Sequence, residues 1–402
     1  MKKLLKRICS FILIFSCLLS CTAISVSAEE ALLISENSQS TSDMGVADSA
    51  LTLNCPCAIL MEATTGAVLY IQNPDKASPP ASVTKIMTLL LVMEAIDSGK
   101  LNLNDTVTVS DNAASMGGSQ VFLKVGEQMS VNDMLKSVII ASANDAAVAL
   151  AEHLCGSVET FVGKMNEKAK KLGMINTYFE NVTGLDDTVQ NHLTSARDIA
   201  IMSRELIQHE TVLQYSSIWM DTIRNGAFGL TNTNRLVRFY PGCTGLKTGS
   251  TSKAGFCISV TAQREHLSLI CVIMGAESRD ERNAAAASLL DWGFANYALY
   301  TEPAGQADPI AVSGGMENFC PTRYDAFSCV LSKEQVEHVE RSVLLPNGKI
   351  KAPISEGDKV GEIIYRSGET QIGCVKILAA ESVKRIHFFE ILKRMVASFS
   401  LI

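Results

Sequence analysis

Ser82 and Lys85 stand three residues apart at the start of an apolar segment and offer the clearest chemistry in the sequence. Pro79 and Pro80 precede them, and proline is tolerated in the first turn of a helix but not in its interior. Residues 86–96 are mostly apolar helix formers, which predicts a buried helix that begins near Ser82. Because positions i and i+3 share a helix face, the amine can take the proton that the hydroxyl must lose to become a nucleophile.

The same spacing recurs at Ser250 and Lys253, so spacing alone is weak evidence for a site. This second pair lies between Gly249 and Gly255 in a predicted strand, where residues three apart point to opposite faces of the sheet. We therefore do not expect it to form a serine–amine pair. For Ser82, the structural alternative is a serine at a helix start with a lysine nearby on the surface.

Two further motifs have residue types that fit the same site. Lys247-Thr248-Gly249 places a cation beside a hydroxyl, followed by a glycine that lets a ligand approach the backbone, and this combination suits a carboxylate. Its alternative is an ordinary turn before a strand. Ser142-Ala143-Asn144 lies among apolar residues, where polar groups need partners. Its competitor, Ser110-Asp111-Asn112, follows a predicted strand and is interpreted as a helix cap.

The elements around these motifs form an early hairpin, a central group of helices and a late group of strands. We predict strands at 58–61 and 67–70, helices at 131–154, 158–173 and 195–208, strands between 217 and 275, and a helix at 280–297. Ser195 is expected to cap the third of these helices, with Asp198 in its first turn. Helices inserted between early and late strands imply an α+β fold whose sheet is completed from distant parts of the chain.

Length and composition are those of a chain with a large core. At 402 residues and 47% hydrophobic content, the sequence has room for two or three domains. Residues 1–28 combine four basic residues, an apolar run and a small-residue cleavage site, which predicts a secretory signal peptide. The loose acylation-like sequence Leu18-Leu19-Ser20-Cys21 leaves a lipoprotein signal as the alternative. Removal of the signal changes the formal net charge from -7 to about -11, which argues against a nucleic-acid partner.

The rest of the chain divides at changes in composition. Residues 29–50 are rich in Ser, Glu, Asp and Thr and predict a disordered leader. Prolines and a glycine between 303 and 309 mark a boundary, so we predict one domain at 51–303 and a small β-rich domain at 304–383. Residues 384–402 place apolar side chains on one helical face with basic residues nearby, which predicts an amphipathic helix at a membrane surface. A helix docked on the β-rich domain is the alternative.

Cysteines and histidines give no sign of a metal centre. Nine of the 12 cysteines follow the predicted signal, and an odd number cannot pair completely within one chain. We expect most of them to be buried small hydrophobic residues. The six histidines are scattered, without a His-Glu-x-x-His motif, and there is no Cys-x-x-Cys pair. The sequence therefore predicts neither a metal nor a cofactor.

Together, the three motifs in this order resemble the active-site set of penicillin-binding proteins and serine β-lactamases. More closely, the chain is similar to low-molecular-weight D-alanyl-D-alanine carboxypeptidases. The resemblance covers about residues 51–300 and continues more weakly through the β-rich C-terminal domain. It rests on these segments: Pro80-Ala81-Ser82-Val83-Thr84-Lys85-Ile86-Met87-Thr88, Ala141-Ser142-Ala143-Asn144-Asp145, Phe179-Glu180-Asn181-Val182-Thr183-Gly184-Leu185-Asp186, Thr194-Ser195-Ala196-Arg197-Asp198 and Gly245-Leu246-Lys247-Thr248-Gly249.

The resemblance implies a β-lactamase/transpeptidase-like domain, in which helices flank an antiparallel sheet and the active site lies beside a helical subdomain. Ser82 would attack the carbonyl between the two terminal D-alanines of a peptidoglycan stem peptide, release D-alanine and leave an acyl-enzyme that water hydrolyses. Lys85 would act as the general base in its neutral form, with its pKa lowered by burial and by the charge of Lys247. Ser142 would relay the proton to the leaving amine. β-Lactams would acylate the same serine and inhibit the enzyme.

The resemblance also assigns the substrate-binding residues. Asn144 would hold the substrate amide and help to orient Lys85, whereas Lys247 and Thr248 would bind the terminal carboxylate. Gly249 and Ser250 would adjoin the substrate, and the backbone N–H groups of Ser82 and Ser250 would form the oxyanion hole. The chain departs from the family in two places, with Ala143 where glycine is common and Ser250 where several relatives have a larger side chain. Neither departure argues for inactivity.

The implied location is outside the cytoplasm, on the outer face of the cytoplasmic membrane or in the cell wall space. Three alternative functions stay open. A β-lactamase would use the same acylation chemistry, but the Glu-x-x-Leu-Asn run typical of one class is absent. A D,D-endopeptidase that cuts peptidoglycan cross-links is chemically close. A noncatalytic wall-binding protein is the alternative of a different class, and the intact Ser82, Lys85 and Lys247 argue against it.

Overall fold

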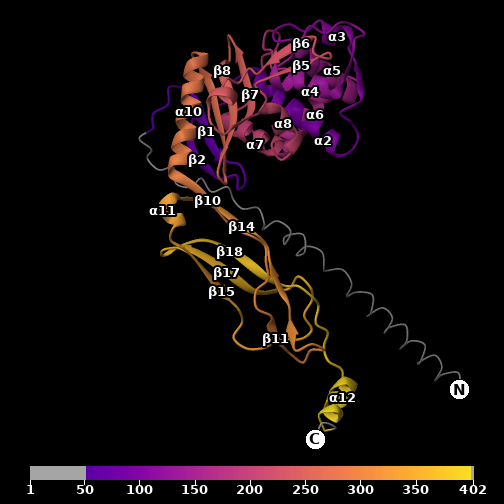
Figure 1. Ribbon diagram of the computed structural model, residues 1–402, viewed down its shortest axis with the longest axis vertical. Coiled ribbons are helices and arrows are strands. Elements are labelled where there is room, and N and C mark those ends of the chain that lie inside the picture. Colours follow the sequence, from indigo (N-terminus) through magenta and orange to yellow (C-terminus); the bar gives the residue numbers. More distant parts are fainter. Residues whose placement is uncertain (1–50, 400–402) are drawn as a thin grey trace, which may run out of the picture. The chain divides into compact units, whose positions relative to one another are not determined.

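The computed structural model describes residues 51–399, so the predicted signal peptide and leader lie outside the described residues. An antiparallel five-stranded sheet in the order β2-β1-β9-β8-β7 is the framework of the first large part (Figure 1). Its strands are β1 (Cys57–Glu62), β2 (Val68–Gln72), β7 (Cys243–Thr251), β8 (Gly255–Arg264) and β9 (Leu267–Ala276). The pairing of β1 with β9 confirms that distant parts of the chain complete one sheet.

Helices cover both faces of this sheet because successive strand residues point to opposite sides. Ile59 and Val272 face a core shared with the helices of the central segment, whereas Leu60 and Cys271 face a second core. The second core is closed by α10 (Arg279–Asn296), which lies along the sheet in Figure 1. The predicted helix at 280–297 is thus confirmed.

The segment that carries Ser82 enters the first core through a tight turn. A single 3₁₀ turn, η1 (Ala81–Thr84), leads into α2 (Lys85–Asp97), so the α-helix itself begins at Lys85. Nearly every residue of α2 from Lys85 to Ala95 is buried, as its apolar sequence predicts. Side chains three apart eclipse one another in a 3₁₀ turn, so this geometry brings Ser82 and Lys85 together.

The helical segment contains one break that the sequence did not predict. The periodicity at 131–154 belongs to two helices, α4 (Val131–Ile140) and α5 (Asn144–Cys155). The expectation of one helix is wrong because Ser142 has φ 62°, a left-handed conformation that an α-helix does not accommodate. The other two predicted helices are α6 (Val158–Lys171) and α7 (Ala196–Leu206), and Ser195 caps α7 by accepting a hydrogen bond from the Asp198 amide.

Short elements complete this part of the chain. They are β3 (Thr106–Thr108), α3 (Asp111–Ala114), β4 (Gln128–Ser130), α8 (Glu210–Ser216), β5 (Met220–Ile223), β6 (Phe228–Thr231) and α9 (Leu236–Phe239). Ser110 caps α3, with its Oγ 3.0 Å from the amide nitrogen of Ala113. The interpretation of Ser110-Asp111-Asn112 as a helix cap is therefore confirmed.

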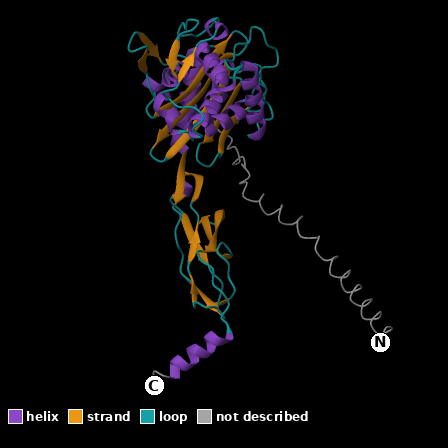
Figure 2. Cartoon of the chain, turned by 90° about the vertical axis from the view of Figure 1, so that its right-hand side faces the viewer, coloured by secondary structure: helices purple, strands orange, loops and turns teal. Residues whose placement is uncertain are grey.

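The C-terminal part is rich in strands, as predicted (Figure 2). Its strands are β10 (Tyr297–Glu302), β11 (Ile310–Ser313), β12 (Phe319–Cys320), β13 (Thr322–Tyr324), β14 (Phe327–Ser332), β15 (Val339–Leu344), β16 (Ile350–Lys351), β17 (Lys359–Ser367) and β18 (Thr370–Ala379). The stacked rings of Phe327 and Tyr365, with centroids 4.3 Å apart, lie in a separate small core. A short helix that the sequence did not predict, α11 (Lys333–Val336), follows β14.

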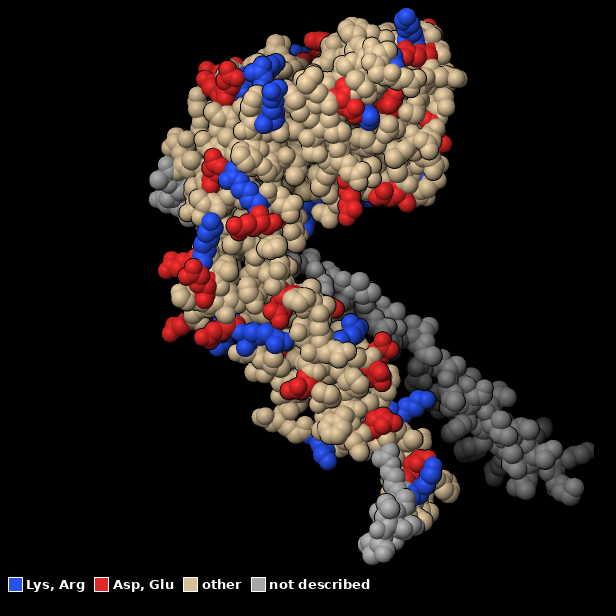
Figure 3. Space-filling view, in the orientation of Figure 1, with Lys and Arg blue, Asp and Glu red and all other residues tan. Residues whose placement is uncertain are grey.

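The predicted C-terminal helix is present as α12 (Phe388–Phe399). Within residues 51–399, no helix is both long and apolar enough to span a membrane. The cysteines of the same range are all free thiols, some buried and some partly or fully exposed. On the face drawn in Figure 3, acidic and basic side chains are interspersed.

Candidate active site

The serine and lysine at the start of α2 lie in contact. Nζ of Lys85 is 2.9 Å from Oγ of Ser82, and the lysine side chain is completely buried. The same nitrogen lies 2.5 Å from Oδ1 of Asn144 and 3.0 Å from the carbonyl oxygen of Thr183. The amine is therefore fixed in direction by two groups from other segments while it faces the serine hydroxyl.

The surroundings of Lys85 favour its neutral form. Burial lowers the pKa of Lys85 well below its ordinary value, and the charge of Lys247 lowers it further. The carboxylate of Asp145 acts in the opposite direction and has a smaller effect. A neutral amine has a lone pair that can accept the serine proton, so Lys85 meets the electrostatic requirement for a general base.

A second buried lysine joins the motif of β7 to the break between α4 and α5. Nζ of Lys247 donates hydrogen bonds to Oγ of Ser142 at 2.9 Å and to the carbonyl oxygen of Thr248 at 2.8 Å. Burial, followed by the charge of Arg282, lowers the pKa of Lys247 to about 7. The left-handed backbone of Ser142 thus presents its hydroxyl to the amine of Lys247 from a distant strand.

Two glycines allow other segments to approach the nucleophile turn closely. A Cβ atom on Gly249 would lie 2.7 Å from the amide nitrogen of Ser82, and one on Gly184 would lie 1.8 Å from the carbonyl oxygen of Ala81. Both distances are impossible for real side chains. The glycine of the Lys-Thr-Gly motif is therefore required because β7 packs directly against the turn that carries Ser82.

A buried histidine, His192, supports the same turn through hydrogen bonds, and sequence reasoning missed it. Burial lowers the pKa of His192 to about 4, so the ring is neutral at pH 7. Its Nδ1 accepts a hydrogen bond from the Glu180 amide at 3.0 Å, which leaves the proton on Nε2, 2.7 Å from Oγ1 of Thr84. The Thr84 hydroxyl in turn donates to the carbonyl oxygen of Ala81, the residue before the nucleophile. No motif signals this chain of hydrogen bonds.

The loop at 117–127 forms a wall of the site and is tied to Asn144. The side-chain amide of Asn144 donates to the carbonyl oxygen of Gly117, and its backbone N–H donates to the carbonyl oxygen of Ser119, both at 2.7 Å. Because Oδ1 of Asn144 accepts a hydrogen bond from Lys85, the position of this loop is linked to the position of the Lys85 amine.

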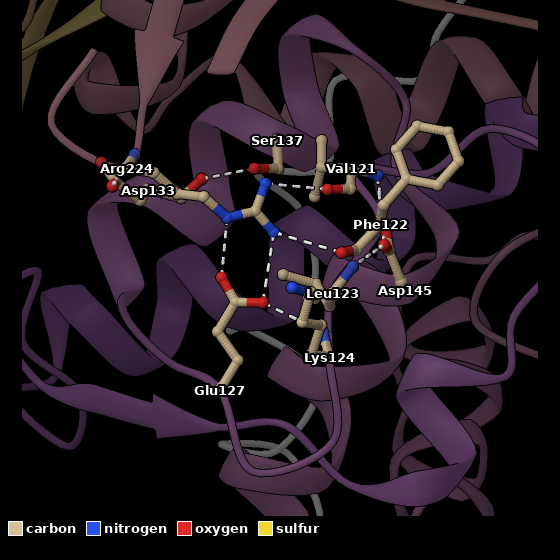
Figure 4. A network of polar contacts seen from close by, with 9 residues as sticks. All are labelled: Val121, Phe122, Leu123, Lys124, Glu127, Asp133, Ser137, Asp145 and Arg224. Carbon is tan, nitrogen blue, oxygen red and sulfur yellow. Dashed lines mark hydrogen bonds and ion pairs between the residues drawn. The ribbon is translucent and has the colours of Figure 1, made fainter. Parts of the chain in front are cut away.

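Two charged side chains hold the middle of this loop from opposite directions (Figure 4). The carboxylate of Asp145 accepts hydrogen bonds from the amides of Val121 and Leu123. The guanidinium of Arg224, from the turn between β5 and β6, donates to the carbonyl oxygen of Val121 at 2.9 Å and to the carboxylate of Glu127 at 2.7 Å. Hydrogen bonds to both the backbone amides and a backbone carbonyl of the loop therefore fix its position.

A cavity of about 580 Å³ opens above these groups. Ser82, Ser142 and Thr248 line it together with Gly249 and Ser250, so five of the predicted site residues share one cavity. Lys85, Asn144 and Lys247 are buried beside the cavity. Lys85 and Lys247 form hydrogen bonds with two of its lining residues, Ser82 and Ser142. Its remaining lining residues are Ser119, Trp219, Thr231, Asn232, Thr233, Arg235, Phe239, Arg279 and Arg282.

Sequence reasoning also missed Arg282, a buried arginine among the residues that line the cavity. Arg282 is 2% exposed yet lines the same cavity as Thr248, whereas Nζ of Lys247 donates a hydrogen bond to Ser142. Burial, and then the charge of Arg279, lowers the pKa of Arg282 to about 10, so it stays cationic at neutral pH. Arg282 lies near the start of α10 and belongs to no recognisable motif, so no sequence signal identified it.

A serine hydroxyl that faces a buried lysine with a lowered pKa is an arrangement suited to acyl transfer. Within residues 51–399, no three His, Cys, Asp or Glu side chains gather to form a metal site. A family model described as D-alanyl-D-alanine carboxypeptidase matches residues 44–278, and one described as penicillin-binding protein 5, C-terminal domain, matches residues 323–385. The chain therefore belongs to the D-alanyl-D-alanine carboxypeptidase family.

Individual relatives agree with this assignment. The chain is 40% identical over 364 residues to the D-alanyl-D-alanine carboxypeptidase DacF of Bacillus subtilis (strain 168). The aligned region covers 89% of this chain and 92% of DacF. The crystal structure of penicillin binding protein 5 from Haemophilus influenzae matches with a TM-score of 0.75 and 30% identity, over 84% of this chain and 99% of that one. An ampicillin-bound structure of penicillin-binding protein D2 from Listeria monocytogenes matches with a TM-score of 0.57 and 33% identity, over 61% of this chain and 100% of that one. These matches confirm the predicted family and its α+β fold.

Proposed function

We propose that this chain removes the terminal D-alanine from peptidoglycan stem pentapeptides through an acyl-enzyme on Ser82. The observation that supports this most directly is the 2.9 Å separation between Oγ of Ser82 and Nζ of a buried lysine whose pKa is lowered. In the same reading, residues 51–303 form the catalytic domain and residues 304–383 the β-rich C-terminal domain.

Acylation begins with transfer of the Ser82 proton to neutral Lys85 while Oγ bonds to the carbonyl carbon of the penultimate D-alanine. The backbone N–H groups of Ser82 and Ser250 stabilise the oxyanion of the tetrahedral intermediate. Lys85 returns the proton to Ser142 while Ser142 passes its own proton to the nitrogen of the departing D-alanine, so the carbon–nitrogen bond breaks and both groups regain their starting protonation. Because Ser142 accepts a hydrogen bond from Lys247, its own proton is directed away from that ammonium and toward the cavity.

Deacylation repeats the same steps with water. A water molecule loses a proton to Lys85 and attacks the ester carbonyl, and Ser82 leaves with that proton. The products are the tetrapeptide and the regenerated serine. A β-lactam presents a strained amide to the same nucleophile, so we infer that it acylates Ser82 and inhibits the enzyme.

The terminal carboxylate of the substrate is placed beside Thr248 and the guanidinium of Arg282. Arginine is a strong hydrogen-bond partner of carboxylates, and Arg282 lines the cavity together with Thr248. Lys247 lies next to the Ser142 hydroxyl that it orients, and its positive charge also attracts the carboxylate. Asn144 uses its oxygen to orient Lys85 and one amide hydrogen to hold Gly117, which leaves its second amide hydrogen for the substrate amide.

The test is incubation of the purified protein with a stem pentapeptide, with products identified by mass. Loss of one D-alanine in wild type, and none in a folded Ser82→Ala variant, is the expected result. Absence of release by wild type would favour a noncatalytic wall-binding protein. Rapid turnover of a labelled penicillin, in place of a long-lived acyl-enzyme, would favour a β-lactamase.

We further propose that the enzyme acts outside the cytoplasm and attaches to the outer face of the membrane through α12. Phe388, Phe389 and Met395 expose more than half of their side-chain surface, and Lys393 lies on the same helix. An amphipathic helix with this composition binds a membrane interface. Truncation after Lys384 should release the protein from membranes, and a truncated protein that still sediments with them would contradict the proposal.

A further inference from the structure

An exposed aromatic side chain, that of Phe122, projects from the loop at 117–127 that forms a wall of the active site. Phe122 is 64% exposed, whereas its neighbours Val121 and Leu123 are buried. Its ring points away from the polar contacts of the loop (Figure 4). The steps of the proposed reaction give this ring no role. A single exposed apolar residue is ordinary on a protein surface, so its significance depends on how it is held.

The backbone of Phe122 is held in a strained conformation by the groups around it. Its φ of 58° is left-handed, a region that a bulky side chain rarely adopts. The carboxylate of Asp145 accepts hydrogen bonds from the amides on either side, those of Val121 and Leu123. The guanidinium of Arg224 donates to the carbonyl oxygens of Val121 at 2.9 Å and of Phe122 itself at 3.4 Å. Strain that the surroundings enforce in this way is concentrated at functional sites.

A second aromatic ring supports the first. Phe228, the first residue of β6, meets Phe122 edge to face, with ring centroids 6.3 Å apart. The guanidinium of Arg224 lies 5.3 Å from the centroid of the Phe228 ring, so one arginine fixes both the backbone of the loop and the supporting ring. The two rings therefore form a rigid aromatic pair, of which the Phe122 ring is exposed to solvent.

The aromatic pair lies at the rim of the active-site cavity. Ser119 precedes Phe122 by three residues, Thr231 follows Phe228 by three, and both Ser119 and Thr231 line the cavity. Three residues of chain span at most about 11 Å. The backbone N–H of Asn144 donates to the carbonyl oxygen of Ser119 at 2.7 Å. This part of the rim therefore adjoins the residue that we assign to the substrate amide.

The proposed substrate has a group of matching shape at a matching distance. In a stem pentapeptide the scissile carbonyl belongs to the fourth residue, and the glycan strand is attached to the first. Four residues span at most about 14 Å, so the nearest sugar lies outside the cavity but within reach of its rim. A sugar ring has an apolar face that stacks on an aromatic ring. A rigid aromatic face suits such a flat ring, whereas a flexible peptide side chain requires no fixed orientation of its partner.

We propose that Phe122, supported by Phe228, binds a sugar ring of the glycan strand that carries the stem peptide, so that the enzyme prefers glycan-linked pentapeptides to free ones. This inference rests on the proposed function and extends its substrate from the peptide to the glycan. The rings are already ordered by Arg224 and Asp145, so little conformational entropy is lost when the sugar binds. The contact lies away from the reacting atoms and acts on substrate binding.

The kinetic test compares kcat/KM of the full-length protein for a disaccharide-linked pentapeptide and for the same pentapeptide without the sugars. Wild type should prefer the linked substrate by about fivefold, the effect of one favourable aromatic contact. Phe122→Ala should abolish this preference, whereas Phe122→Tyr should keep it. A disturbed loop would slow both substrates alike and leave their ratio unchanged. Phe319→Ala is the matched control, because Phe319 of β12 is 61% exposed and should not affect the ratio.

Binding is measured separately on the Ser82→Ala protein, which leaves the linked substrate intact. Saturation-transfer NMR should detect transfer to the sugar ring protons, and Ser82→Ala/Phe122→Ala should lose this transfer while transfer to the peptide protons remains. Equal wild-type kcat/KM for the two substrates, or sugar transfer that persists without the Phe122 ring, would overturn this inference and leave the carboxypeptidase proposal standing. Cleavage of neither substrate would overturn the carboxypeptidase proposal, whereas the NMR result on Ser82→Ala decides the sugar contact independently.

Discussion

Two Ser-x-x-Lys pairs occur in this chain, and only one of them forms a site. Ser82 and Lys85 lie on a 3₁₀ turn that enters a buried helix, with oxygen and nitrogen 2.9 Å apart. Ser250 lies near the end of β7, and Lys253 follows the strand in an exposed turn, where its Nζ donates to the carbonyl oxygen of Asp186 at 2.5 Å. The same residue types at the same spacing therefore have different partners.

The difference lies in backbone conformation and burial. A 3₁₀ turn eclipses residues three apart, so it brings Ser82 and Lys85 together. The second pair is divided between β7 and the turn that follows it, so the prediction that both residues lie in one strand is wrong for Lys253. Burial then lowers the pKa of Lys85 and makes its amine a base. In the proposed mechanism Ser250 contributes only its backbone N–H, so its side chain and that of Lys253 are natural controls for the first pair.

Replacement of the first serine should have the largest effect. Ser82→Ala removes the nucleophile and should reduce penicillin acylation and D-alanine release by about 10⁴-fold or more. Ser250→Ala keeps the backbone N–H and should change either rate by no more than a few fold. Acylation by fluorescent penicillin and product analysis by mass measure both. Comparable losses in the two variants, with both folded by circular dichroism, would show that the pairs do not differ as proposed.

Replacement of the lysines should give the next largest contrast. Lys85→Met keeps an unbranched side chain in the buried site but removes the base, and should slow acylation about 10³-fold, since general bases contribute 10²–10⁴. Lys253→Met removes a surface amine and should leave acylation within about twofold of wild type. A Lys85→Met variant that acylates at the wild-type rate would exclude Lys85 as the base.

Much of this architecture follows from local sequence patterns. Helices and strands were predicted where the signal lies within a few consecutive residues. Such signals are strand alternation, helix periodicity and cap residues such as Ser110 and Ser195. The three catalytic motifs were recognisable because each combines several residues. The break at Ser142 was not, because its left-handed backbone is imposed by tertiary contacts rather than by residue preference.

The residues that escaped prediction act alone and across long sequence separations. His192 reaches Thr84, and Arg224 reaches Val121 and Glu127, over 97 to 108 positions in the chain. A single arginine or histidine has no periodicity and no motif, so its partner cannot be inferred from one sequence. Arg282 is similar, since its role depends on a cavity that only the folded sheet creates.

The pH dependence of acylation offers a finer comparison of the two buried lysines. Acylation requires neutral Lys85. The acylation rate should therefore rise as the pH increases through the lowered pKa of Lys85, and it should fall at more acidic pH because the amine becomes protonated. The charge of Lys247 lowers the pKa of Lys85, so Lys247→Met should raise that pKa and move the acid limb to higher pH. Lys253→Met should leave the limb unchanged. A limb that stays in place in Lys247→Met would remove the electrostatic link between the two lysines.

The smallest effect is expected from the residues that hold Lys85 indirectly. Arg224→Gln removes the donors that bind Val121 and Glu127, so the loop at 117–127 should become more mobile. Asn144, which is bonded to this loop, should then hold Lys85 less firmly at its distance from Ser82. Small misplacement of a catalytic group slows a reaction, and we expect kcat to fall about three- to tenfold with little change in KM. Stopped-flow acylation at several pH values measures this, with Arg323→Gln, at an exposed arginine of β13, as the control. A merely structural role would lower the melting temperature without a change in kcat, whereas a positioning role also changes kcat in the fully folded protein.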